Sequence, residues 1–320
     1  MDTGKFEARA QPKSSRNRLI LAIAGAVLVI VAIIAVTGYL VFGRTSSGQT
    51  ASKQAASPSA AAARSEAVLP FSLKDPEGVG VDRAGNVYVV DSGDQRVLQL
   101  PAGSSTPTEM PFTGLNNPAG LAVDNNGSLY VADQDNKRVL KLPAGAKTQI
   151  ELPFTGLTEP HGVTVDSTGN VYVSDLKNNQ VLELPAASNT QVVVPFTPLN
   201  QPYGLAADSA DGVYVADAGN NRVQKLPAGT TTPVILPFTG LNFPNTVAVD
   251  RGNNVYVTDL NNDRVLKLTA GSNTVSQLPF TGLFAPYGIA VTDQGDVYVV
   301  DFRNQVLKMP AGYQATPLGR

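Results

Sequence analysis

Short runs of alternating apolar and polar residues recur along the chain from about residue 66 onward. In the unit that begins at Pro160, four such runs are Gly162–Asp166, Val171–Asp175, Val181–Leu184 and Gln191–Val194. Residues with turn propensity, chiefly Gly, Asn and Ser, separate the runs. Short β-branched runs joined by such turns predict four antiparallel strands.

This unit repeats every 42 residues. Three invariant positions mark it: a proline, a tyrosine 12 residues later and an aspartate three residues after that. The prolines are Pro76, Pro118, Pro160, Pro202, Pro244 and Pro286; the tyrosines are Tyr88, Tyr130, Tyr172, Tyr214, Tyr256 and Tyr298; the aspartates are Asp91, Asp133, Asp175, Asp217, Asp259 and Asp301. A period of 40 to 45 residues with four strands per unit is typical of a propeller blade. The sequence therefore predicts an all-β, six-bladed β-propeller over residues 66–320.

A second signature, an apolar residue followed by Pro-Phe, precedes each proline unit and does not follow the last one. The run Ala67–Phe71 is therefore left over at the start, and one strand is missing at the end. We expect this run to complete the sixth blade beside Gln305–Met309, since ring closure removes exposed strand edges. The tail Tyr313–Leu318 competes for that place, but Pro317 weakens it as a strand.

The segments Pro118–Asp124 and Asn136–Leu142 resemble NHL repeats, and the Pro-Phe-Thr-Gly-Leu linkers are similar to those in the extracellular sensor of mycobacterial receptor serine/threonine kinases. The resemblance implies a six-bladed NHL propeller outside the cell. It does not extend to the kinase, because no glycine-rich loop, lysine-bearing strand or H-R-D loop is present. The triplet that begins at Asp301 falls in a blade turn and is no D-F-G motif.

Ahead of the repeats, Leu19–Phe42 is a run of 24 residues without a charge. As a helix it would span about 36 Å, enough to cross a bilayer. Five basic residues precede the run, which places the N-terminus in the cytoplasm by the positive-inside rule. We expect a cytoplasmic tail over 1–18, a single-pass transmembrane helix over 19–42, a flexible linker over 43–65 and an exported propeller over 66–320.

Composition narrows the choice of function. The chain has no cysteine, which excludes disulfides, thiol catalysis and iron–sulfur clusters. Residues 66–320 hold 24 acidic and 16 basic side chains, a net charge of −8. A nucleic-acid partner is not expected, because binding to phosphates needs clustered Lys and Arg.

The sixfold aspartates suggest a ring of calcium ligands, yet every blade has its own copy in the same context. We therefore interpret them as structural carboxylates that accept hydrogen bonds from turns. The tyrosines are interpreted as packing between blades.

Function is sought where the repeats differ. The residue after each proline should lie in the loop entering the innermost strand, and the residue after each aspartate in the loop between strands two and three. In a propeller these loops emerge on one face, around the channel mouth. The resulting candidate ligand-binding rim consists of Glu77, His161, Tyr203, Asn245, Tyr287 and Phe302. Such a rim suits a protein, peptide or cell-wall ligand; unconstrained surface variation explains the same differences equally well.

His161 is the sole histidine in the sequence, so a zinc enzyme is not expected. We predict no cofactor, no metal site and no enzymatic activity. The alternative is a divalent-cation-dependent lactonase or lyase of the six-bladed type, in which Glu77, Asn245 and His161 would act near the channel.

Overall fold

The computed structural model describes residues 65–318, all within the second of the two units into which the chain divides, residues 1–56 and 57–320. The expected tail, transmembrane helix and most of the linker (1–18, 19–42 and 43–64) lie outside the described residues. Among the residues described, no helix is long and apolar enough to cross a membrane.

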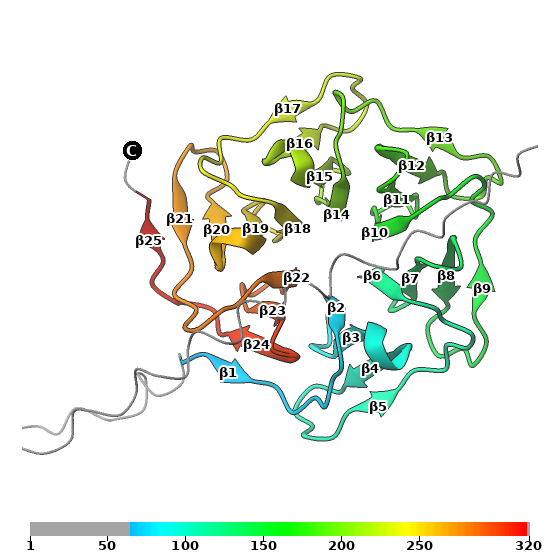
Figure 1. Ribbon diagram of the computed structural model, residues 1–320, viewed down its shortest axis with the longest axis horizontal. Coiled ribbons are helices and arrows are strands. Elements are labelled where there is room, and N and C mark those ends of the chain that lie inside the picture. The colour runs from blue at the N-terminus through cyan, green and yellow to red at the C-terminus, as the bar shows by residue number, and fades with distance from the viewer. Residues whose placement is uncertain (1–64, 319–320) are drawn as a thin grey trace, which may run out of the picture. The chain divides into compact units, whose positions relative to one another are not determined.

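Six antiparallel sheets are arranged in a ring (Figure 1). In each sheet the strands named below run outward from the centre of the ring in chain order. The first blade has β2 (Pro76–Val81), β3 (Val87–Asp91), β4 (Arg96–Leu100) and β5 (Thr108–Glu109). The second has β6 (Pro118–Val123), β7 (Leu129–Asp133), β8 (Arg138–Leu142) and β9 (Ile150–Glu151). The third has β10 (Pro160–Val165), β11 (Val171–Asp175), β12 (Gln180–Leu184) and β13 (Val192–Val193). The fourth has β14 (Pro202–Ala207), β15 (Val213–Asp217), β16 (Arg222–Leu226) and β17 (Val234–Ile235). The fifth has β18 (Pro244–Val249), β19 (Val255–Asp259), β20 (Arg264–Leu268) and β21 (Val275–Gln277), and the sixth has β22 (Pro286–Val291), β23 (Val297–Asp301) and β24 (Gln305–Met309). The predicted six-bladed architecture is confirmed.

The N-terminal strand β1 (Ala67–Val68) closes the ring by pairing with β24, as expected. Leu69 N continues the pairing by donating to the carbonyl of Val306 at 2.8 Å. The Glu66 carboxylate also accepts hydrogen bonds from the backbone N–H and the hydroxyl of Thr281, both at 2.8 Å. The first described residues are thereby fastened to the linker before the last blade, and all the strands of the closed ring lie within 65–318.

The tail forms a strand at a place that the sequence did not indicate. Strand β25 (Thr316–Pro317) pairs antiparallel with β21 as a fifth strand of the fifth blade. The alternative of a tail strand in the sixth blade is therefore not realised, and the tail forms a strand in spite of Pro317. Pro317 is tolerated because it lies at the outer edge of the sheet, where no further strand needs its missing N–H.

Apolar contacts between neighbouring blades form the core. Tyr88 of β3, for example, packs in one cluster with Leu121 and Leu129 of the second blade. Its hydroxyl donates to Asp82 at 3.0 Å, and the same bond recurs in the next four blades. Burial, followed by the charge of Asp82, raises the pKa of Tyr88 to about 12. The tyrosines therefore join adjacent blades, in agreement with the interpretation from sequence.

The six repeated aspartates have fully buried side chains that fix the loops around them. Asp133 accepts hydrogen bonds from Asn116 N, Arg138 Nε and Asn136 Nδ2 at 2.7 to 2.8 Å. The bond from Asn116 reaches back 17 residues to the linker that precedes the blade, so the partners extend beyond the carboxylate's own turn. These hydrogen bonds indicate a structural role for the repeated aspartates, because each carboxylate is bonded within its own blade and the linker before it.

Candidate functional site

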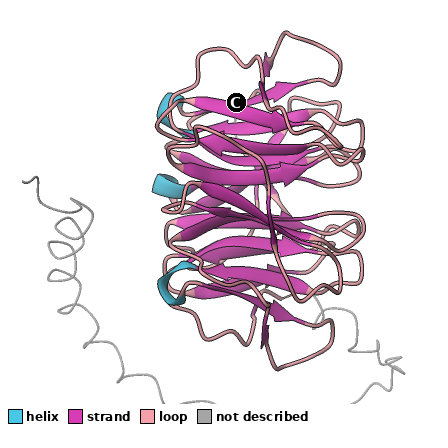
Figure 2. Ribbon diagram, turned by 90° about the vertical axis from the view of Figure 1, so that its right-hand side faces the viewer, coloured by secondary structure: helices cyan, strands magenta, loops and turns pink. Residues whose placement is uncertain are grey.

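Two sets of loops lie on the same face of the propeller, as the sequence predicted. In the first blade, Ser92 N donates to the carbonyl of Asp75 at 3.1 Å, which joins the turn after β3 to the loop before β2. Corresponding bonds join Leu176 to Glu159 and Phe302 to Phe284, both at 3.0 Å. The 3₁₀ turns η2 (Ser92–Asp94), η3 (Ala218–Asn220) and η4 (Leu260–Asn262) all lie on this face (Figure 2). We call it the mouth face.

The residues after the prolines lie inside the innermost strands rather than in the loops that enter them. Glu77 is the second residue of β2 and His161 the second residue of β10. In every blade the register shifts immediately after the proline, which pairs with the repeated aspartate before regular pairing resumes three residues later. This irregularity places the variable residues at the mouth on rigid strands.

Below the variable residues is a collar of glycines, formed by Gly78, Gly120, Gly162, Gly204 and Gly288, with Thr246 as the sixth member. A Cβ on Gly78 would lie 2.6 Å from the carbonyl oxygen of Ala119 in the next blade. Real Cβ atoms do not approach a carbonyl oxygen so closely. The collar therefore consists of glycine because the inner strands touch backbone to backbone.

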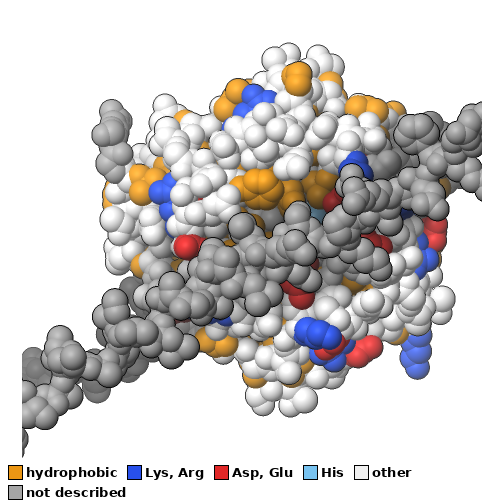
Figure 3. All heavy atoms as spheres, in the orientation of Figure 1, with side chains coloured by type: hydrophobic (Ala, Val, Ile, Leu, Met, Phe, Trp, Pro, Cys, Tyr) orange, Lys and Arg blue, Asp and Glu red, His pale blue; other side chains and the backbone are white. Residues whose placement is uncertain are grey.

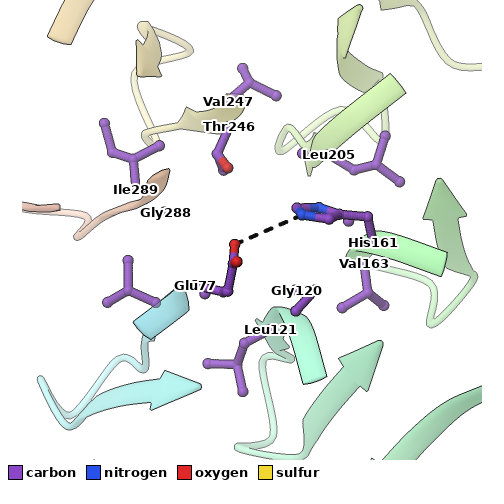
Figure 4. A pocket seen from close by; sticks show the side chains of 15 residues that line it. Glu77, Gly120, Leu121, His161, Val163, Leu205, Thr246, Val247, Gly288 and Ile289 are labelled. Carbon is purple, nitrogen blue, oxygen red and sulfur yellow. Dashed lines mark ion pairs between the residues drawn. The ribbon is translucent and has the colours of Figure 1, made fainter. Parts of the chain in front are cut away.

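One layer further in lie six aliphatic residues, Val79, Leu121, Val163, Leu205, Val247 and Ile289, whose side chains pack in the apolar clusters between neighbouring blades. Glu77, Ala119 and His161, the glycine collar with Thr246 and these six residues line a cavity of ≈ 60 Å³ (Figure 4). On the face seen in Figure 3, hydrophobic and acidic side chains lie in view near the centre, with a histidine among them.

Glu77 and His161 point toward one another across the cavity (Figure 4). His161 Nε2 lies 3.9 Å from Glu77 Oε2, and the two side chains are 11% and 14% exposed. They come from the first and third blades, and the small Ala119 of the second blade lies between them in the ring. The pair is an ion pair when the imidazole is protonated.

Aromatic rings extend from this pair on one side. The ring centroid of Tyr203 lies 4.5 Å from that of His161 in an edge-to-face arrangement, and Phe243 lies 5.1 Å beyond Tyr203. Tyr203 is 9% exposed and packs with Leu176 and Ala218, two residues that directly follow repeated aspartates. The sequence therefore identified the position of Tyr203 at the mouth but missed the supporting role of Phe243.

A second aromatic group occupies the sixth blade. Phe302 lies 5.7 Å from Phe284 and 6.4 Å from Tyr287 between ring centroids. Phe284 and Phe302 are 44% and 36% exposed. The structure therefore places Tyr287 and Phe302 together, as expected of a rim, and adds Phe284 as a partner that the sequence analysis did not select.

Asn245 is the most deeply buried of the predicted rim residues, at 2% exposure. Its Oδ1 accepts a hydrogen bond from the hydroxyl of Thr246 at 3.0 Å, and its Nδ2 has no hydrogen-bond partner among the described residues. Thr246 reaches into the cavity (Figure 4). It was missed from sequence, although its departure from glycine in the collar was a detectable signal.

Among the described residues, no group of three or more His, Cys, Asp or Glu side chains is arranged to hold a metal ion. The mouth instead combines one acid, one imidazole, one carboxamide and two aromatic groups. Such a set can take up the polar and apolar parts of a ligand at once.

Comparison with known proteins supports the repeat assignment. Five segments match the profile of the NHL repeat: residues 73–100, 115–142, 157–184, 199–226 and 241–268. The chain is 48% identical over 112 residues to the serine/threonine-protein kinase PknD of Mycobacterium tuberculosis (strain H37Rv), a match that covers 33% of this chain and 15% of the kinase. The chain therefore corresponds to only a small part of that relative.

Solved structures show the same fold at low sequence identity. A streptogramin B lyase superimposes with a TM-score of 0.60 at 14% identity, covering 76% of this chain and 96% of the lyase chain. A chain of a nidogen/laminin complex gives a TM-score of 0.61 at 23% identity, covering 68% of this chain and 84% of that one. At these identities the likeness concerns the fold alone.

Proposed function

We propose that this chain, an NHL-repeat six-bladed β-propeller, is a membrane-anchored extracytoplasmic binding or sensor module. It captures a protein, peptide or cell-wall ligand on its mouth face through Glu77, His161, Tyr203, Asn245, Tyr287 and Phe302. One observation carries the proposal: blades that are otherwise alike differ at the mouth. There Glu77 and His161 line a cavity, and the fourth and sixth blades each contribute a group of aromatic side chains.

The location rests on two independent arguments. The uncharged run 19–42 with basic residues before it favours export of the propeller. The resemblance to the extracellular sensor region of PknD favours the same side of the membrane. Kinase activity is not part of the proposal, because the sequence of this chain shows none of the kinase motifs.

A lactonase or lyase is the alternative. It draws support from fold likeness to a lyase at 14% identity, which does not extend to chemistry. A binding role accounts better for the two aromatic groups, since clustered aromatic rings offer the large contact area typical of binding surfaces.

Capture from an extract of the cell envelope tests the proposal. Immobilised residues 57–320 should retain a specific component, and the double substitution Tyr203→Ala and Tyr287→Ala should abolish its retention. The matched control is Val192→Ala with Ile235→Ala, which removes exposed apolar groups from the outer strands β13 and β17. Equal retention by the mouth variant and the wild type would refute the proposal.

A further inference from the structure

Two blades carry a hydroxyl at a position where the other four are apolar. The residue directly before the repeated aspartate is Ser174 in the third blade and Thr258 in the fifth. The corresponding residues of the other blades are Val90, Ala132, Ala216 and Val300. Ser174 and Thr258 are fully buried, and a buried hydroxyl is unfavourable unless it is hydrogen-bonded. The partners of the two hydroxyls therefore indicate their role.

The hydroxyl of Ser174 bridges the third and fourth blades. Its Oγ accepts a hydrogen bond from Gly162 N at 2.8 Å and donates to the carbonyl oxygen of Tyr203 at 2.6 Å. Gly162 lies where the register of β10 and β11 shifts after the proline, so its N–H bonds to a side chain rather than to the neighbouring strand. Ser174 thus connects the inner strand of its own blade to the backbone of a rim tyrosine in the next.

The hydroxyl of Thr258 bridges the fifth and sixth blades in the same way. Its Oγ1 accepts a hydrogen bond from Thr246 N at 2.9 Å and donates to the carbonyl oxygen of Tyr287 at 2.8 Å. The carbonyl oxygen of Thr246 is a second, more distant acceptor at 3.3 Å. The acceptor in the next blade is again the backbone of a rim tyrosine.

The two bridges coincide with the two rim tyrosines. The residue after the repeated proline is tyrosine in the fourth and sixth blades alone, and these are the blades that follow the two hydroxyls. All six blades share the register shift after the proline. A hydroxyl that the fold itself required would therefore be expected in all six. Its restriction to the blades that precede a tyrosine points to a role in holding the tyrosines.

A bridge at the carbonyl fixes the backbone of each tyrosine against the blade before it. The third blade holds Tyr203 at two points, because Ser174 bonds to its backbone and the His161 ring lies 4.5 Å from its ring. The fifth blade holds the backbone of Tyr287, whose ring lies 6.4 Å from that of Phe302. Aromatic side chains that are fixed before binding lose less conformational entropy when a ligand binds.

We propose that Ser174 and Thr258 are positioning residues of the mouth. Their hydroxyls set where Tyr203 and Tyr287 stand, and thereby which ligands the two aromatic groups accept. The proposal rests on the proposed function and deepens it, because it names residues that govern selectivity without touching the ligand. Both side chains are fully buried and act through the backbone of the tyrosines.

His161 reports the position of Tyr203 directly. It is the sole histidine in the sequence, so its imidazole gives the only histidine signals in a proton NMR spectrum of residues 57–320. The ring current of Tyr203 shifts these signals, because the two rings are adjacent. At pH 8.5, well above the ordinary imidazole pKa of about 6.5, Ser174→Ala should move the signals. Ser174→Thr, which introduces the residue found in the fifth blade, should keep them near the wild-type positions, and Thr258→Val should leave them unchanged.

A fluorine label gives Tyr287 its own readout. In residues 57–320 labelled with 3-fluorotyrosine, the signal of Tyr287 is the one that Tyr287→Phe removes. It should move in Thr258→Val and return in Thr258→Ser, which introduces the residue found in the third blade. Ser174→Ala should leave it in place.

A purely structural role for the hydroxyls predicts a different result. Both hydroxyl-free variants would then unfold at lower urea concentration, while the native signals of His161 and Tyr287 would stay at their wild-type positions. Unmoved signals in folded variants would overturn the proposal. If one variant does not fold, the other decides, since the two bridges lie in different blades. Failure of both to fold would also overturn it, because the fold itself would then need the hydroxyls.

Capture from the envelope extract separates this proposal from the proposed function. The variant Ser174→Ala with Thr258→Val should retain several-fold less of the captured component, and Ser174→Thr with Thr258→Ser should retain as much as the wild type. If the hydroxyl-free variant retains the component fully while Tyr203→Ala with Tyr287→Ala abolishes retention, the positioning role fails and the binding module stands. Full retention by the tyrosine variant refutes both.

Discussion

Replacement of one repeated aspartate tests how the loops of the mouth face are held. Asp217 is fully buried and accepts hydrogen bonds from Asn200 N at 2.8 Å, Arg222 Nε at 2.7 Å and Gln224 Nε2 at 3.0 Å. Asp217→Asn removes the charge and turns an amide donor toward these donors. Loss of one partner of a buried ion pair costs about 3 to 5 kcal/mol. Because the Arg222 side chain is 25% exposed and can regain water, we expect about 3 kcal/mol.

The matched control is Asp301→Asn in the sixth blade. Asp301 accepts hydrogen bonds from Arg303 N at 3.0 Å, Gln305 Nε2 at 3.2 Å and Phe284 N at 3.4 Å. Gln305 pairs with Asp301 where Arg222 pairs with Asp217 in the fourth blade, so no charged partner is lost. This substitution should cost about 1 kcal/mol, as expected for neutral hydrogen bonds.

Urea unfolding of residues 57–320 at pH 7 measures both variants. A loss of about 3 kcal/mol lowers the midpoint by about 1 M when the slope is about 3 kcal/mol per M. Equal midpoints for the two variants would show that the charge of the aspartate does not hold the loop. An unchanged midpoint for Asp217→Asn would refute a structural role for this residue.

Three further predictions concern the ring itself. Gly78→Ala should lower the free energy of unfolding in urea by about 1 to 3 kcal/mol, because its Cβ would press on the backbone of the next blade. The control Gly252→Ala should be nearly neutral, because its Cβ meets only side chains at 3.2 Å or more. Equal losses for the two variants would contradict the close backbone contact at the glycine collar. Deletion of residues 66–71 should give an unstable or oligomerising domain, and a monomer of unchanged melting temperature would disprove closure by β1. The pKa of Tyr88 is about 12 in the fold against 10 in an unfolded chain, so the protonated tyrosine stabilises the fold. This contribution to stability is fully present below pH 10 and is lost as the pH rises from 10 to 12. A melting temperature that stays constant over this range would contradict the prediction.

The 42-residue period was enough to predict the blades, because strand length, turn chemistry and packing between blades are local and repeat six times. Closure by the first strand was also predictable from one unmatched signature. Pairing of β25 with β21 could not be predicted from the sequence. A tail that contains a proline can pair only at an outer sheet edge, and the folded ring determines which edge is in reach.

The sequence showed which positions vary near the mouth, but not how their side chains are arranged. Variation after the repeated prolines identified Glu77 and His161. That His161 Nε2 lies 3.9 Å from Glu77 Oε2 follows from the closed ring, in which the small Ala119 stands between them. Comparison of the repeats at the second residue after each proline would have identified Thr246, which stands where the other five repeats have glycine. Phe243 and Phe284 precede the innermost strands by one and two residues, and only the folded loops show that they pack on rim aromatics.

Hydrogen–deuterium exchange of residues 57–320, with and without the captured envelope component, tests the central claim most directly. The account predicts protection on binding in the loops before the innermost strands and in the turns after β3, β11, β15, β19 and β23, all on the mouth face. Protection confined to the turns between the first two strands of each blade, or to the outer strands, would contradict it.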